Sequence, residues 1–213
     1  MEELDKLKNH WNKSAGNFPK FSEKDIYAML HKKSSSIVKW ILIISILEFL
    51  FWLVMSFLLK DSNSTKMIES LDIDYITMPM SVIGYGIIIY FLYQFYISYR
   101  KITTTDNVKT LMANILNTRK TVSNYIYVNL AYIIISCILI FVIYFYKDEA
   151  LIAAVHQSEA DGNALWFYLI YIVTTIICLA IFILIIWLFY KLIYGILLKR
   201  LHRNYEELKK IDF

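Results

Sequence analysis

The sequence predicts an all-α polytopic membrane protein in which four transmembrane helices extend into a small cytoplasmic bundle. Three observations lead to this fold class. Hydrophobic residues make up 58% of the 213 residues, which exceeds ordinary globular usage. Four apolar stretches are each long enough to cross a hydrocarbon core of ~30 Å, which takes about 20 helical residues. Their apolar residues run continuously instead of alternating, and this favours helices over a membrane β-barrel.

The four expected transmembrane segments are 37–59, 75–98, 125–146 and 165–188. A polar segment of 36 residues precedes the first transmembrane segment, and no small-residue cleavage site follows this transmembrane segment. We therefore expect the first segment to remain in the mature protein and not to act as a cleaved signal peptide. Most tryptophans and many tyrosines fall toward the ends of the segments, and we interpret them as aromatic belts at the membrane interface.

The distribution of basic residues predicts the direction of the segments. Seventeen Lys and Arg lie in 1–36, in 100–124 and after Leu198, whereas only three lie in 60–74 and 147–164. Cytoplasmic loops carry the excess of basic residues in membrane proteins. Both termini and the loop 100–124 are therefore expected in the cytoplasm.

The expected cytoplasmic segments 1–36, 100–124 and 199–213 have the pattern of amphipathic helices. Ser22 and Asp25 resemble a capping box at the start of one helix. Another is expected to start in 103–106 and to continue without a break to Tyr146, because no Gly or Pro interrupts it. The apolar stripes can pack against one another, lie on anionic lipid or bind another protein. Mutual packing is the simplest arrangement, because exposed apolar stripes are unfavourable.

Glu48 falls near the middle of the first expected transmembrane segment. An acid at that depth costs ~2.5 to 3.5 kcal/mol on insertion scales, so it normally faces a partner or a cavity. Counting depth from the segment ends predicts that Ser136, Thr174 and Thr175 lie at the same level and bond to a protonated Glu48. Glu48 then either fixes helix packing or serves as a proton or cation site.

No other set of residues predicts chemistry. His156, Glu159 and Asp161 stand beside an expected turn without a convincing ligand spacing, and no nucleophile, phosphate loop or zinc motif is present. We therefore predict no enzyme activity, no metal and no cofactor. Basic pairs such as Arg100-Lys101 and Arg119-Lys120 are interpreted as topology determinants that touch lipid headgroups, and not as a nucleic-acid site.

The N-terminal pattern Leu4-x-x-Leu7-x-x-x-Trp11, followed by Ser22-x-x-x-Ile26-x-x-Met29-Leu30-x-x-Lys33-Ser34-Ser35-Ser36, resembles a group of uncharacterised bacterial four-span inner-membrane proteins. Some members of that group are encoded beside an extracytoplasmic-function sigma factor. The resemblance covers about the first 50 residues. It implies a bacterial inner-membrane location and an anti-sigma-like role, although only 36 residues precede the first expected span, fewer than in a usual anti-sigma domain.

Two functions from different classes compete. The first is a non-enzymatic membrane-anchored regulator or adaptor that binds a cytoplasmic protein, such as a sigma factor, through its amphipathic helices. The expected contacts are Leu7, Trp11, Ile26, Met29 and Leu30. The alternative is a small transporter or channel-like protein that uses Glu48 and works as a homo-oligomer, because four helices enclose little space. An assembly subunit without its own activity is a third possibility.

Overall fold

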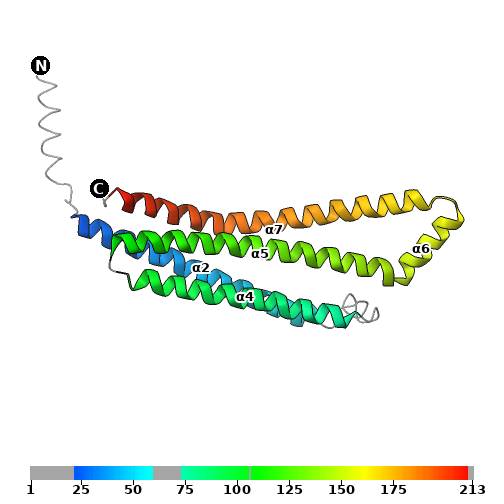
Figure 1. Cartoon of the computed structure of the whole chain (residues 1–213), viewed down its shortest axis with the longest axis horizontal. Coiled ribbons are helices and arrows are strands. Elements are labelled where there is room, and N and C mark those ends of the chain that lie inside the picture. The colour runs from blue at the N-terminus through cyan, green and yellow to red at the C-terminus, as the bar shows by residue number, and fades with distance from the viewer. Residues whose placement is uncertain (1–21, 60–72, 106, 211–213) are drawn as a thin grey trace, which may run out of the picture.

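The computed structural model describes residues 22–59, 73–105 and 107–210. These residues form five helices and no strand, which confirms the predicted all-α class. The helices are α2 Glu23–Leu59, α4 Asp74–Thr103, α5 Val108–Lys147, α6 Glu149–Ala160 and α7 Ala164–Lys209 (Figure 1).

Four of these helices, α2, α4, α5 and α7, are long and apolar enough to span a membrane. The shortest, α4, has 30 residues and the longest, α7, has 46. At about 1.5 Å per residue they are ~45 Å and ~69 Å long, whereas the hydrocarbon core measures ~30 Å. Each long helix therefore extends beyond its apolar segment, as the sequence predicted.

The helix starts follow local sequence signals. The backbone N–H of Ser22 donates to Asp25 Oδ2 at 3.0 Å, and the N–H of Asp25 donates to Ser22 Oγ at 3.2 Å, so the predicted capping box is present. The hydrogen bonds from the Ser22 side chain and backbone hold the pKa of the Asp25 carboxyl below its usual range. The helix α5 is continuous, as predicted, but its cap is Asn107, whose side chain accepts from the N–H of Lys109 at 2.9 Å.

The expected loop 147–164 contains the helix α6, and the expected turn follows that helix. Asp148 caps α6 by accepting from the N–H of Leu151 at 2.8 Å, and four of the 12 residues of α6 are helix-forming Ala. His156 and Glu159 then lie one turn apart on this helix, with Nδ1 and Oε2 3.3 Å apart. The chain turns only after α6, at Gly162, whose φ of 74° suits glycine.

The four long helices form a bundle in which α2 packs on α4, α4 on α5, α5 on α7 and α7 again on α2. The start of α2, the end of α7 and the α4–α5 connection lie together at one end of the bundle, which we name the terminal end (Figure 1). The opposite end, where α6 joins α5 to α7, is the distal end. Toward it α5 and α7 diverge, and α6 crosses between them.

Both clusters of buried hydrophobic residues lie in the terminal half of the bundle, and only Ile73, next to the start of α4, is a buried hydrophobic residue outside them among the described residues. One cluster near the terminal end contains Leu30, Val38, Ile102, Leu111, Ile115, Leu201 and Leu208. A second cluster follows toward the distal end and contains Ile41, Phe91, Phe95, Val122, Tyr125, Tyr190 and Tyr194. Within the described helices, α5 has no buried residue after Asn129 and α7 has none before Tyr190.

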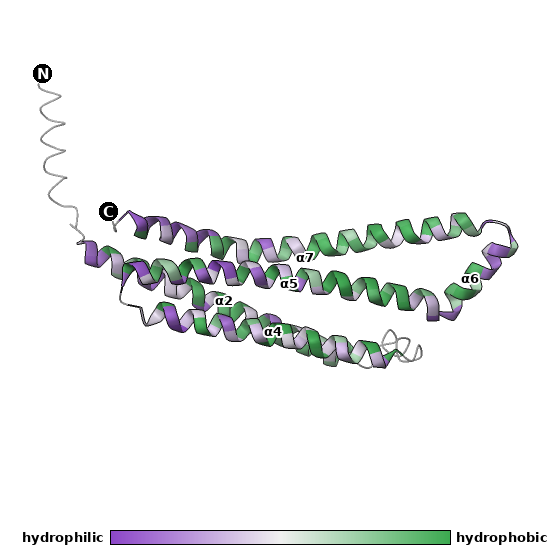
Figure 2. Ribbon diagram, viewed as in Figure 1, coloured by the Kyte–Doolittle hydropathy of each residue, from purple (hydrophilic) through white to green (hydrophobic). Residues whose placement is uncertain are grey.

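The distal half is apolar but open. Figure 2 shows hydrophobic residues over the distal parts of α5 and α7, and hydrophilic residues concentrated at the terminal end. Leu165 of α7 is 85% exposed, for example. Such surface is stable only if lipid or another apolar partner covers it, which agrees with helices that cross a bilayer.

Polar side chains also join helices in the terminal half. Asn204 of α7 donates to Ser34 of α2 at 3.1 Å, and both residues are buried. His31 Nε2 lies 2.7 Å from the carbonyl oxygen of Ile102, which joins α2 to the end of α4. In the terminal half, the apolar faces of α2, α4, α5 and α7 therefore pack against one another. Hydrogen bonds between the helices fix their register.

Candidate functional site

Glu48 of α2 lies between two tyrosines of α7. The hydroxyl of Tyr190 donates to Oε1 at 2.6 Å, and the hydroxyl of Tyr194 donates to Oε2 at 3.2 Å. The two tyrosines are four residues apart, so they project from the same face of the helix. Each carboxyl oxygen of Glu48 thus receives one phenol donor.

A third tyrosine, Tyr125 of α5, stands at the centre of this group. Its ring meets those of Tyr190 and Tyr194 edge-on, with centroids 6.0 and 5.7 Å apart, and it meets Phe91 and Phe95 of α4 in the same way at 5.3 and 5.4 Å. Side chains from all four long helices therefore meet here. We call Glu48, Tyr125, Tyr190 and Tyr194 the tyrosine junction.

The hydroxyl of Tyr125 is buried and makes no hydrogen bond to the described residues, although it lies near the Glu48 carboxylate. Among the residues that the structure describes, no ion pair joins Glu48 to a basic side chain. The junction therefore combines one titratable acid with neutral phenols. Hydrogen bonds to both of its oxygens hold the Glu48 carboxyl group in one orientation against α7.

A cavity of about 350 Å³ opens between α2, α4 and α5 on the distal side of the junction. Its walls are mainly apolar, and Asn129 and Tyr190 lie at the edge toward the junction. Gly84 allows α5 to approach, since a Cβ at this position would lie 2.9 Å from the hydroxyl oxygen of Tyr132. That hydroxyl donates to the carbonyl of Met80, and so joins α5 to α4 beside the cavity.

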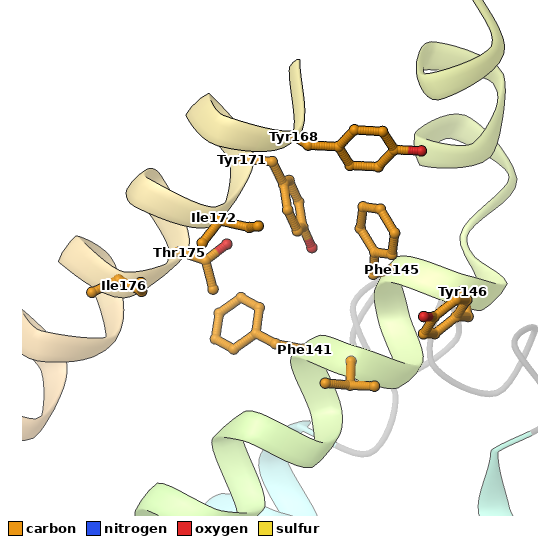
Figure 3. A pocket seen from close by; sticks show the side chains of 9 residues that line it. Phe141, Phe145, Tyr146, Tyr168, Tyr171, Ile172, Thr175 and Ile176 are labelled. Carbon is orange, nitrogen blue, oxygen red and sulfur yellow. The ribbon is translucent and has the colours of Figure 1, made fainter. Parts of the chain in front are cut away.

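The structure does not bring the predicted hydroxyl residues to Glu48. Ser136 lines a separate pocket between α4, α5 and α7, and its Oγ is buried without a partner among the described residues. Thr174 is exposed. Thr175 lines a pocket of about 310 Å³ between the distal parts of α5 and α7, where aromatic side chains such as Phe145 and Tyr171 face each other (Figure 3).

This prediction failed because it assumed that the midpoints of all segments lie at one level. The bonds from Tyr190 and Tyr194 place Glu48 level with the residues that follow the fourth expected segment. Thr175 precedes Tyr190 by 15 residues on the same helix, which corresponds to ~22 Å. The apolar stretch of α7 is longer than that of α2, so their midpoints do not coincide.

Two of the expected partner contacts are occupied inside the protein. Leu30 is 2% exposed and belongs to the terminal cluster, and Ile26 packs against the same cluster. Leu30 is thus covered in this conformation, whereas Ile26 is only partly buried, and their role as partner contacts stays a prediction. Met29, one position before Leu30, is 41% exposed. Leu7 and Trp11 lie outside the described residues.

Sequence reasoning did not identify the three tyrosines of the junction. The aromatic-belt interpretation covered tyrosines near segment ends, and Tyr125, Tyr190 and Tyr194 all lie near such ends. One signal was available: Tyr190 and Tyr194 have the i, i+4 spacing of a single helix face. The sequence could not indicate that this face meets Glu48.

Comparisons with known proteins add a family and no activity. No curated protein and no solved structure matches the chain. One family profile, described as a domain of unknown function (DUF8845), matches residues 24–213 and thus includes nearly all of α2 and the whole of α4, α5, α6 and α7. The chain therefore belongs to the DUF8845 family.

Proposed function

We propose that this protein is a membrane-anchored regulator or adaptor of the bacterial inner membrane, whose terminal end lies in the cytoplasm and binds a cytoplasmic protein. The observation that carries the proposal is the position of the core. Both buried clusters lie in the terminal half, whereas the distal apolar half has an open interior. Anchoring alone requires about 20 residues per helix, so the extended and packed terminal bundle needs another purpose.

The tyrosine junction links the membrane part to that bundle. It lies where the buried core ends, and it joins α2 to α7 through Glu48. Toward the terminal end, the Ser34–Asn204 bond joins the same two helices again. A change in the packing of the distal half would therefore be passed to the terminal bundle through the α2–α7 pair, which is the behaviour expected of a signal-responsive anchor.

The partner is expected to contact the terminal end through Met29 and through the segment that contains Leu7 and Trp11. An extracytoplasmic-function sigma factor is the partner class that the N-terminal resemblance implies. A regulator of this kind holds its partner through apolar anchors at a helix surface, so a charge at an anchor should weaken binding strongly.

Purification of the intact protein from its native membrane tests this proposal. We expect a stoichiometric cytoplasmic protein to co-purify, and we expect Met29→Glu to reduce its recovery by about tenfold, equivalent to ~1.4 kcal/mol. Leu116→Glu on α5 is the matched control, because Leu116 is 42% exposed and Met29 is 41% exposed. Absence of any stoichiometric partner, or equal loss with both variants, would contradict the proposal.

A small transporter or channel is the second candidate, and one observation favours it. The cavity between α2, α4 and α5 reaches Tyr190, which bonds to Glu48. An intramembrane acid beside a cavity is a common feature of proton and ion pathways. If this function holds, liposomes that contain the protein should conduct protons or cations, and Glu48→Gln should abolish the flux. Flux that is absent, or equal in both proteins, would remove this candidate.

A further inference from the structure

A polar cleft of about 260 Å³ lies between α4 and α5, on the terminal side of the tyrosine junction. All but one of its lining side chains are polar, and none is acidic. They include Ser98, Lys101, Asn114, Asn117, Lys120 and Thr121. Two lysines without an acidic neighbour in the lining suit a polar, negatively charged group.

The cleft contains two lysine ammonium groups that no acidic side chain of the described residues pairs with. Among the described residues, neither Lys101 nor Lys120 forms an ion pair, and both are exposed. The neighbouring polar groups are held in place: Asn114 donates to Thr105 Oγ1 at 3.0 Å, and the hydroxyl of Thr121 donates to the carbonyl of Asn117 at 3.0 Å. The two lysines can therefore turn toward an anion in the cleft.

The cleft lies in the layer where basic residues of several helices gather. Asn114 Nδ2 is 3.4 Å from the carbonyl oxygen of Lys101, which places the two helices in register there. Arg119 of α5 lies 2.9 Å from His202 of α7, beside the basic pair Lys199-Arg200. Basic layers of this kind mark the headgroup region at one membrane surface.

Toward the distal end the cleft continues into a second pocket of about 310 Å³. The two pockets share Gln94, Thr121 and Asn124, whereas the second also has apolar and aromatic walls, among them Phe91 and Val128. The groove along α4 and α5 thus loses its lysines and gains aromatic side chains toward the apolar half, although it keeps some polar groups there. An anionic phospholipid has the same order of groups, a phosphate followed by acyl chains.

We propose that the groove between α4 and α5 binds an anionic phospholipid, with Lys101 and Lys120 on its phosphate and the acyl chain along the aromatic pocket. A soluble phosphate would use only the polar end. The continuation of the groove into the apolar half favours the lipid, and basic pockets between membrane helices are established sites for such headgroups. This inference does not depend on the proposed regulator function.

Native mass spectrometry of the full-length protein in a neutral detergent tests the proposal, with added phosphatidylglycerol and, for comparison, phosphatidylcholine. Near a membrane surface each Lys contributes about 1 kcal/mol to the attraction of an anionic lipid, equivalent to about fivefold in affinity. The double variant Lys101→Gln, Lys120→Gln should therefore bind phosphatidylglycerol about 25-fold more weakly. Both side chains are exposed, so the variant should remain folded.

The matched control is Lys199→Gln, Arg200→Gln, which removes the same charge from α7 outside the groove. We expect it to change phosphatidylglycerol binding by less than about twofold, since those two residues touch neither pocket. Equal weakening by both double variants would show only general surface attraction and would overturn the site. Glycerol phosphate, which has the headgroup without chains, should not displace the lipid at equal concentration. Displacement would overturn the lipid assignment in favour of a soluble anion.

Discussion

Replacement of Tyr125 by Ala is expected to lower the free energy of unfolding by about 3 to 5 kcal/mol, the range found for large aromatic residues in packed cores. Tyr125 is fully buried, and its ring contacts aromatic rings of α4 and α7. Removal of the ring leaves a cavity where the four long helices meet. Denaturation in mixed micelles of a mild detergent and dodecyl sulfate measures the change.

Tyr125→Phe separates the ring from the hydroxyl. Because the hydroxyl makes no hydrogen bond to the described residues, its removal should change stability by less than about 1 kcal/mol. A loss as large as that of Tyr125→Ala would mean that the hydroxyl, and not the ring, holds the junction together. In that case the third phenol would have to be counted as a functional partner of Glu48.

The fold class could be predicted because it depends on composition and on segment length. The bilayer requires about 20 apolar residues in each helix, and this requirement is visible in a single sequence. The capping box at Ser22 and the continuous helix to Tyr146 could be predicted because their signals are local, and α5 ends one residue later, at Lys147. The turn at Gly162 lies where the sequence indicated it, but the helix α6 before it was not predicted, because the segment 147–164 was read only as a loop between two apolar segments.

The candidate site could be predicted only in part. Glu48 could be identified from the sequence because the insertion of an acid into an apolar segment costs free energy, whichever residues it contacts. The residues that contact Glu48 depend on the position of α2 along the axis of α7. The contacts of buried residues set this register. The Ser34–Asn204 bond and the terminal cluster fix it in the structure. An estimate of depth from the segment ends could not include those contacts. It therefore selected Thr175 instead of Tyr190 as a partner of Glu48.

The position of the core predicts different stability changes for the replacement of two leucines of α7. Leu201 is fully buried in the terminal cluster, whereas Leu169 is 53% exposed in the distal half. Leu201→Ala should lower the free energy of unfolding by about 2 to 5 kcal/mol, while Leu169→Ala should change it by less than about 0.5 kcal/mol. The same micelle denaturation measures both variants.

This comparison tests the division of the bundle into two halves. If the terminal half holds the helices together, lipid or detergent solvates Leu169 equally well before and after unfolding, and its truncation has little effect. A large loss with Leu169→Ala would mean that the distal halves are covered by another protein surface, most simply a second copy of the chain. The open distal half would then be an assembly interface, and the terminal bundle would not be the sole source of stability.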